Sequence, residues 1–155
     1  MTVLGPHYHV GFVVPDLAAA MAALGPALGV EWTTVTRSTR RVRTDAGEQV
    51  LAFVVTYSVQ GPPHLELVES IPGTLWEAGE GPRLHHLGVW SDDVRADSET
   101  LGAAGLARLA AGLTDGDTWR WAYHANPVGG LLELVTSSQQ GALAERIAGG
   151  RASER

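Results

Sequence analysis

Two short motifs recur in this chain, and each half places one histidine and one glutamate at corresponding points. The first half opens on His9, in a His-Val-Gly run, and the second opens on His86, in a His-Leu-Gly run. Each half closes on a Leu-Glu-Leu-Val run, which contains Glu66 or Glu133. Imidazole nitrogens and carboxylate oxygens together bind borderline divalent cations. The repeat therefore predicts a metal site whose ligands are His9, Glu66, His86 and Glu133.

The two glutamates lie in a pattern that is typical of half-buried strands. Each is flanked by leucines, and successive residues of a strand point to opposite faces. The carboxylates are therefore expected to face a polar cavity while the leucines pack. Alternatively, the glutamates face solvent and the histidines only begin strands, which is the better interpretation for any one of these residues alone. For four residues at matched positions of a repeat, metal binding is the better interpretation.

The segments around these motifs predict the same order of elements in both halves. An apolar run at 9–14 ends at Pro15-Asp16, and a helix-spaced apolar stripe follows over 17–28. Asp92-Asp93 precede a second helix, expected over 94–104. Strand-like segments follow each helix, so each half is predicted to be βαβββ. The later strands are expected at 31–43, 50–58, 65–69, 106–111, 118–125 and 131–136.

The domain organisation follows from length and from the repeat. The chain has 155 residues, and no Pro/Ser-rich linker or long run of charge divides it. We expect one domain that contains two duplicated modules, 7–70 and 84–136. The tail, 137–155, is expected to form a short helix near 142–148, and no function is assigned to it.

Composition excludes several classes of function. The net charge of −6 disfavours nucleic acid, because phosphate backbones are bound by clustered basic residues. The chain has no Cys, and all 11 basic residues are Arg, which excludes thiolate chemistry and Schiff-base catalysis by Lys. No apolar run is long enough to span a bilayer, and the N-terminus lacks the pattern of a signal peptide. We therefore expect no membrane partner and a cytoplasmic location.

The two His-X-Gly motifs and the two Glu-bearing runs resemble those of the vicinal oxygen chelate superfamily. Its members include glyoxalase I, methylmalonyl-CoA epimerase, extradiol dioxygenases and bleomycin resistance proteins, and the resemblance covers about residues 7–136. It implies an α+β fold in which two βαβββ modules form a curved eight-stranded mixed sheet around a metal-binding cavity. It also implies a small-molecule substrate, a homodimer and one divalent ion, which can be Zn, Ni, Co, Mn or Fe, held by the four predicted ligands.

The resemblance is strongest to the epimerase-like members and implies a metal-dependent isomerase, epimerase or lyase. In such an enzyme, the cation stabilises an enolate of a carbonyl compound while a carboxylate removes the adjacent proton. By similarity to glyoxalase I, Glu133 is the first candidate for this base and Glu66 is the second. The epimerases have a further glutamate that is not a ligand, and the corresponding stretch here, 49–53, places Val, Leu or Ala there, with Glu48 nearby.

Two other functions are left open by the sequence. An extradiol-type dioxygenase would bind ferrous iron through two His and one Glu, and Glu66 would then have no role. A binding protein for an antibiotic or a hydrophobic metabolite would use the same cavity without chemistry. Such a protein needs no metal ligands, so the four-residue set counts against it.

Further residues are candidates for contacts with a substrate. Aromatic side chains from several strands can wall an apolar pocket. His124 shares strand parity with Arg120, which predicts that both face an acidic group of the ligand. The Arg-rich segment 37–43 can bind phosphate, although a charged edge strand is the better interpretation. The predicted substrate-binding residues are His124, Arg120, Phe53, Tyr57 and Trp90.

Overall fold

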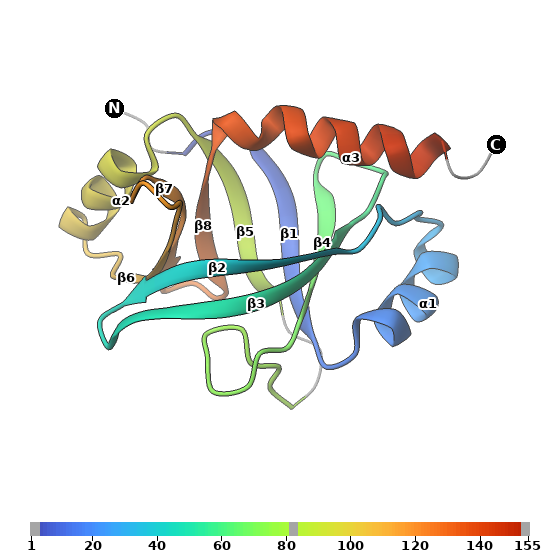
Figure 1. Cartoon of the computed structure of the whole chain (residues 1–155), viewed down its shortest axis with the longest axis horizontal. Coiled ribbons are helices and arrows are strands. Elements are labelled where there is room, and N and C mark those ends of the chain that lie inside the picture. The colour runs from blue at the N-terminus through green and yellow to red at the C-terminus, as the bar shows by residue number, and fades with distance from the viewer. Residues whose placement is uncertain (1–3, 81–83, 153–155) are drawn as a thin grey trace.

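The computed structural model describes residues 4–80 and 84–152, and the βαβββ order occurs twice, as predicted (Figure 1). The first module contains β1 (His7–Val14), α1 (Leu17–Leu28), β2 (Thr36–Thr44), β3 (Gly47–Tyr57) and β4 (His64–Glu69). The second contains β5 (Leu84–Ser91), α2 (Val94–Ala103), β6 (Arg108–Leu113), β7 (Trp119–Ala125) and β8 (Leu131–Thr136). A 3-10 helix, η1 (Ser137–Gln139), then leads into α3 (Gln140–Ala152).

The strands form one closed mixed sheet, in the order β1-β4-β3-β2-β6-β7-β8-β5. Within each module, the first strand pairs in parallel with the last, β1 with β4 and β5 with β8. Two antiparallel pairs, β1 with β5 and β2 with β6, join the modules. The predicted fold class, an α+β protein with a curved eight-stranded mixed sheet, is confirmed.

The first two helices begin at the predicted aspartates. Asp16 accepts a hydrogen bond from the backbone N–H of Ala19 at 2.8 Å, and Asp93 accepts one from Ala96 at 3.0 Å. Such caps satisfy backbone donors that the first turn leaves free. Helix α1 ends at Gly29, whose φ of 65° lies in the left-handed region that glycine adopts without strain. Within residues 4–80 and 84–152, no helix has the length and apolar character needed to cross a membrane.

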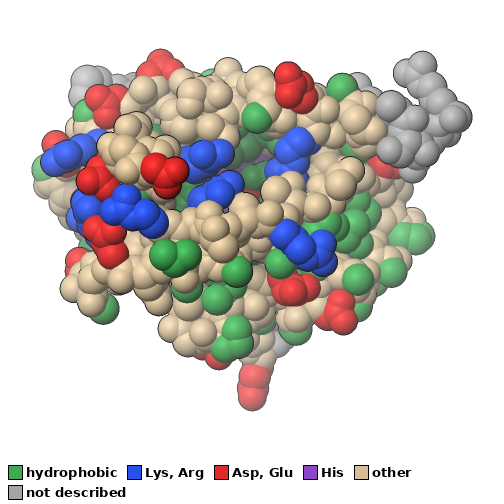
Figure 2. All heavy atoms as spheres, in the orientation of Figure 1, with side chains coloured by type: hydrophobic (Ala, Val, Ile, Leu, Met, Phe, Trp, Pro, Cys, Tyr) green, Lys and Arg blue, Asp and Glu red, His purple; other side chains and the backbone are tan. Residues whose placement is uncertain are grey.

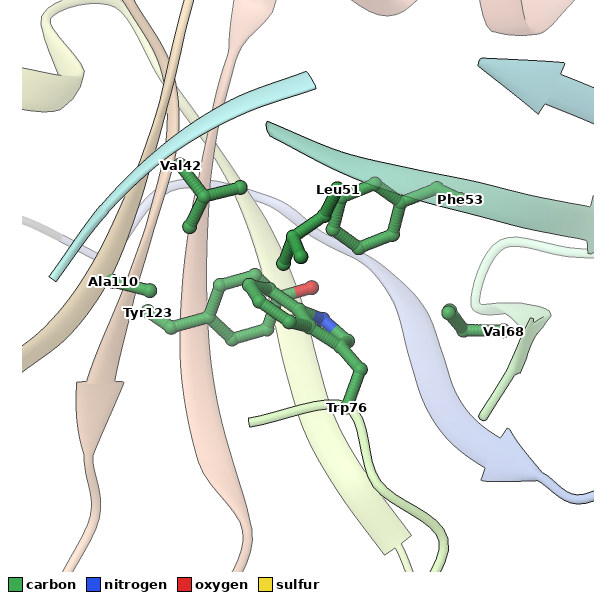
Figure 3. Close-up of a cluster of buried hydrophobic side chains, with 7 residues drawn as sticks. All are labelled: Val42, Leu51, Phe53, Val68, Trp76, Ala110 and Tyr123. Carbon is green, nitrogen blue, oxygen red and sulfur yellow. The ribbon is translucent and has the colours of Figure 1, made fainter. Parts of the chain in front are cut away.

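Hydrophobic side chains are buried on both sides of the sheet. Inside the barrel, Trp76 from the loop between β4 and β5 lies against Phe53 and Tyr123 (Figure 3), with ring centroids 4.9 and 5.3 Å apart. On the other side, Trp119 and Val94 belong to a second cluster, where α2 packs on the sheet. The inner cluster is rigid support for the cavity that the barrel encloses.

The tail differs from the prediction. Helix α3 is longer than expected, and it contributes Leu143 and Arg146 to the lining of the cavity. Near its end, a Cβ added at Gly150 would approach Val59 to 2.9 Å, so the helix packs closely on the loop that follows β3. No periodic pattern in this segment connects it with the interior of the barrel.

Candidate metal centre

The four side chains predicted from the repeat meet inside the barrel. His9 Nε2 lies 2.7 Å from His86 Nε2, 3.3 Å from Glu66 Oε2 and 2.9 Å from Glu133 Oε2. His86 Nε2 lies 2.8 Å and 3.2 Å from the same two carboxylate oxygens. Both histidines are fully buried, and each glutamate is only 6% exposed. These four residues are called the floor of the cavity below.

Sheet register brings the two glutamates to the junction between the modules. Strands β1 and β5 are neighbours at this junction, and each is flanked by the last strand of its own module. Glu66 on β4 is the parallel partner of Gly11, and Glu133 on β8 is the parallel partner of Gly88. Both carboxylates therefore line the cavity at the level of the His-X-Gly motifs.

The glycine of each His-X-Gly motif makes room for the histidine of the other module. In the antiparallel β1–β5 pair, His9 lies opposite Gly88, and His86 lies opposite Gly11. A Cβ added at Gly11 would lie 1.9 Å from the His86 ring, and one added at Gly88 would lie 1.9 Å from the His9 ring. Because only glycine allows this close approach, the spacing of His and Gly in each motif is a requirement of the site.

The donor set fits a single divalent cation. Ligand atoms about 2.1 Å from one ion lie about 3.0–3.4 Å apart in octahedral or tetrahedral coordination. The contacts within the floor span 2.7–3.3 Å. Glu66 Oε2 and Glu133 Oε2 are buried, and each lies within 3.3 Å of both histidine Nε2 atoms. When the histidines are neutral and present lone pairs at Nε2, neither oxygen has a hydrogen-bond donor in the part of the chain that the structure describes, and a cation would satisfy both.

Without a cation, the charge of the carboxylates favours protonated histidines. Burial alone would lower the pKa of His9, but the charges of Glu66 and Glu133 outweigh burial and raise it to about 9. The same balance raises the pKa of His86. Burial alone would raise the pKa of both glutamates, and the histidines lower it instead. A bound cation would supply the positive charge that these protons provide.

A second histidine orients His86. His85 Nε2 lies 2.9 Å from the carbonyl oxygen of Leu75, and His85 Nδ1 lies 2.8 Å from His86 Nδ1. Because a carbonyl only accepts, His85 carries its proton on Nε2 and can accept a hydrogen bond at Nδ1. In the neutral ring that a cation requires, His86 then donates from Nδ1, which leaves the lone pair of its Nε2 directed at the other residues of the floor. This is the arrangement by which proteins orient a metal-binding histidine.

A tyrosine lies beside each glutamate of the floor. Tyr57 faces Glu66 across the β3–β4 pair, and Tyr123 faces Glu133 across the β7–β8 pair. The Tyr57 hydroxyl donates a hydrogen bond to Glu66 Oε1. Burial and the charge of Glu66 raise the pKa of Tyr57 well above its ordinary value, so the hydroxyl keeps its proton. The duplication thus extends from the donors to the residues that support them.

The floor closes a cavity of about 270 Å³. Phe53, Trp76 and Trp121 form one wall, in edge-to-face contact with one another. Tyr8 and Trp90 stack on each other at a centroid distance of 3.6 Å and also line the cavity. Apolar walls with a few convergent polar groups are typical of sites for small molecules.

Four of the five predicted substrate-binding residues line this cavity, namely Arg120, Phe53, Tyr57 and Trp90. Glu48, which lies near the stretch where the epimerases have their extra glutamate, is exposed and paired with Arg41 and Arg43. Among the described residues that line the cavity, Glu66 and Glu133 are the only carboxylates.

His124 does not line the cavity, so its predicted contact with a substrate is wrong. It is fully buried beside α2, where its ring nitrogens lie 2.8 Å from Ser98 Oγ and 2.7 Å from the carbonyl oxygen of Leu106. His124 and Arg120 face opposite sides of the sheet because β7 has a bulge at Arg120. Two consecutive residues of β6 pair with Trp121 and Trp119, which are two positions apart on β7. Arg120 lies between them and is therefore an extra residue on β7.

Trp76, Arg40 and Arg146 are among the cavity residues that the sequence did not predict as such. Trp76 lies in an irregular loop, which has no periodicity to reveal the direction of a side chain. Arg146 lies in the tail, to which no function was assigned. Arg40 belongs to the Arg-rich segment interpreted as a charged edge, but β2 is not an edge strand, because it pairs with both β3 and β6. Closure of the barrel turns Arg40 toward the cavity.

Comparisons with known proteins agree with this architecture. A model of the family described as "Glyoxalase/Bleomycin resistance protein/Dioxygenase superfamily" matches residues 8–123. No curated protein matches the sequence significantly.

Several solved structures have the same fold. One is methylmalonyl-CoA epimerase from Mycobacterium tuberculosis, with a TM-score of 0.62 and 18% identity over 92% of this chain and 95% of that one. Another is Streptomyces coelicolor methylmalonyl-CoA epimerase in complex with 2-nitronate-propionyl-CoA, with a TM-score of 0.62 and 18% identity over 87% and 99% of the chains. A hypothetical protein from Bacillus halodurans has a TM-score of 0.58 and 12% identity over 85% and 94%. At these identities, the likeness shows the fold alone.

Proposed function

Because the chain belongs to the glyoxalase/bleomycin resistance protein/dioxygenase superfamily, we propose that it is a metal-dependent enzyme acting on a carbonyl compound. The resemblance to the vicinal oxygen chelate superfamily is confirmed by this membership. The observation that carries the proposal is the convergence of four buried donor residues, all within 4.8 Å of one another, at the floor of an aromatic cavity. The proposed class of reaction is isomerisation, epimerisation or elimination that begins with removal of a proton next to a carbonyl.

His9, His86, Glu66 and Glu133 would hold the cation. When bound, a divalent ion supplies Lewis acidity, which makes the proton beside a coordinated carbonyl easier to remove. The protein contributes a fixed donor geometry and walls of apolar rings that exclude water from the reacting atoms.

We assign the role of base to Glu133 rather than Glu66. The Tyr57 hydroxyl holds Glu66 Oε1 and so ties this carboxylate to the wall of the barrel. For Glu133, burial acts to raise the pKa, and the two histidines act to lower it. A Glu133 carboxylate that moves away from the histidines therefore becomes a stronger base while it remains shielded from water. Glu66 is the second candidate, with a role in returning the proton.

Metal analysis tests this proposal. The protein, purified without a metal-binding tag and reconstituted in turn with Zn, Ni, Co, Mn and Fe, is expected to bind about one ion per chain. His86→Ala and Glu133→Ala are each expected to abolish stoichiometric binding, because each removes one of four ligands. Glu99→Ala, which removes an exposed carboxylate on α2, is the matched control and is expected to bind as the parent does.

Turnover of carbonyl substrates is the second measurement. In the metal-loaded protein, exchange of the proton beside a carbonyl for deuterium should depend on Glu133. Glu133→Gln keeps an oxygen donor, and at a metal concentration that loads this variant it should lower the rate of exchange by about 10²-fold or more. Failure to bind any of the five metals would overturn the proposal and favour a binding protein without chemistry. Metal binding with oxygen-dependent ring cleavage would favour the dioxygenase alternative instead.

A further inference from the structure

Three arginines line the cavity, and none of them is paired with a carboxylate in the described ranges. They are Arg40 on β2, Arg120 on β7 and Arg146 on α3, and they are called the mouth below. Arg41 and Arg43, which form ion pairs with Glu48, do not line this cavity. Figure 2 shows arginine side chains grouped around a hollow in the face of the protein. The mouth thus concentrates positive charge in a chain whose net charge is −6.

Contacts from the protein hold these guanidinium groups in place without neutralising them. Arg120 donates to Gln139 Oε1 at 2.7 Å, and Arg40 donates to the carbonyl oxygen of Thr39 at 2.8 Å. Both acceptors are uncharged, so each guanidinium keeps its full positive charge and further N–H donors. Burial and the charge of Arg120 lower the pKa of Arg40, which shows that the two groups share one environment.

Arg146 carries the clearest sign of a missing ligand. Its guanidinium lies over the Tyr57 ring, 5.0 Å from the centroid, and its NH2 group donates weakly to Thr33 and Thr34 at 3.4–3.5 Å. Its Nε is buried and has no hydrogen-bond partner in the described part of the chain. A buried donor without an acceptor is costly, so the site is incomplete until an acceptor arrives.

The charges of the cavity point to the chemistry of that acceptor. Two carboxylates of the floor and one divalent cation sum to zero, so three positive charges of the mouth would be left in a space of about 270 Å³. Planar guanidinium groups bind carboxylates and phosphates through charge-assisted, often bidentate hydrogen bonds. Phe53, Trp76 and Trp121 provide an apolar wall in the same cavity.

We propose that the mouth is a subsite for an oxyanion of the substrate, a carboxylate or a phosphate attached to an apolar body. The body lies against the aromatic wall, and the oxyanion accepts hydrogen bonds from Arg40, Arg120 and Arg146. This inference deepens the proposed function by naming the class of substrate, and it rests on that function only in taking the cavity as the substrate site. The segment beyond the repeat then has a function: α3 supplies Arg146, and Gln139 at the end of η1, just before α3, holds Arg120.

Ligand binding to metal-free protein separates this inference from the metal. Quenching of tryptophan fluorescence is the readout, because Trp76, Trp90 and Trp121 line the cavity. The probes are benzoate and phenylphosphonate, with benzamide as the neutral isostere of benzoate and inorganic phosphate as an anion without a body. All titrations are made at one ionic strength, because exposed charges are screened by salt. Without metal, a probe's oxyanion can be bound by the mouth but not by the cation.

The expected result is that benzoate or phenylphosphonate binds at least about tenfold more tightly than benzamide. Whichever anion binds more tightly identifies the oxyanion, and tighter binding of inorganic phosphate than of either would indicate a free phosphate site. Arg40→Gln, Arg120→Gln and Arg146→Gln should each weaken binding of the anion about tenfold and leave binding of benzamide unchanged. Arg37→Gln removes the same charge from an exposed position on the same strand and should change neither.

Three results would overturn the inference. They are equal affinity for benzoate, phenylphosphonate and benzamide, equal weakening by Arg37→Gln, and unchanged affinity in all three variants of the mouth. Arg146→Lys, which keeps the charge and the helix, covers the case in which Arg146→Gln fails to fold; it should retain part of the affinity for the anion. Loss of metal binding would leave these results unchanged, so failure of the proposed function and failure of this inference are distinguishable.

Discussion

The floor and the mouth of the cavity are built on different plans. Each module gives the floor one histidine and one glutamate and places one tyrosine beside that glutamate, at matched register positions. The mouth takes one arginine from each module at unmatched strands and a third from α3, outside the repeat.

This difference follows from what each region binds. A single ion can be ligated by equivalent donors from both modules, so a duplication by itself supplies a complete set of ligands. An organic substrate has no two-fold symmetry, so the residues that recognise it need not be repeated. The comparison therefore predicts that substitution of the motif glycines harms metal binding equally in either module, whereas changes in the mouth have local effects.

The largest effect is expected from the glycines of the two motifs. Gly88→Ala would place a methyl group where the His9 ring lies, and Gly11→Ala would do the same to the His86 ring. Each substitution must displace a ligand, so we expect both to abolish stoichiometric metal binding, to a similar degree. Isothermal titration with the metal found for the parent protein measures this.

Gly102→Ala on α2 is the matched control, because an added Cβ there meets no atom within 4 Å. It should bind metal normally and gain about 1 kcal/mol of stability, since alanine favours helix more than glycine does. Unchanged metal binding in Gly88→Ala would show that metal binding does not depend on the close approach of the His9 ring to the backbone. Loss of metal binding in only one of the two motif variants would show that the two modules do not contribute equally to the floor.

The next effect is the pH dependence of the floor. The pKa of His9 is raised from 6.5 to about 9 in the metal-free protein, and a cation requires the neutral ring. Metal affinity should therefore rise at least about tenfold per pH unit up to about pH 9, and more steeply where the ring of His86 is protonated as well. Stability of the metal-free protein should show the opposite trend, with the contribution of His9 complete below about pH 6.5 and lost as the pH rises through 9.

Urea unfolding at several pH values measures the second trend, whose size is on the order of 3 kcal/mol. The metal-loaded protein is the control, because its histidines are already neutral, and it should not lose stability over this range. A metal-free protein that becomes more stable between pH 6.5 and 9 would contradict the charge balance derived for the floor.

The sequence predicted the floor better than the mouth, and the reasons are physical. Positions such as His9 and Glu66 were identified because regular strands and a repeat fix the direction of their side chains. The β7 bulge at Arg120 reverses strand parity, and no residue pattern revealed it, so His124 was assigned to the wrong face. Arg146 depends on where a terminal helix packs, which is a tertiary contact without a local signal.

A smaller effect tests whether the tyrosines of the two modules support the floor equally. Tyr57→Phe removes the hydroxyl that donates to Glu66 Oε1, and we expect metal affinity to fall about tenfold. Tyr123→Phe is the corresponding change in the second module, and it should cost less if Glu133 is the carboxylate that moves. Metal titrations of both variants decide this. A larger loss of metal affinity in Tyr123→Phe than in Tyr57→Phe would indicate that Glu66 is the carboxylate that moves.

His124→Ala is expected to have the smallest effect on the floor and the mouth. Its ring bonds to Ser98 and to the backbone of Leu106 beneath α2, so His124→Ala should destabilise the protein by about 2–4 kcal/mol. Metal affinity and anion affinity should stay at the values of the parent, because none of its contacts reaches the floor or the mouth. Urea unfolding and the two titrations measure these quantities in one variant. If His124→Ala lowered the affinity for the anion and left stability unchanged, His124 would have to face the cavity. The bulge would then lie at another position on β7.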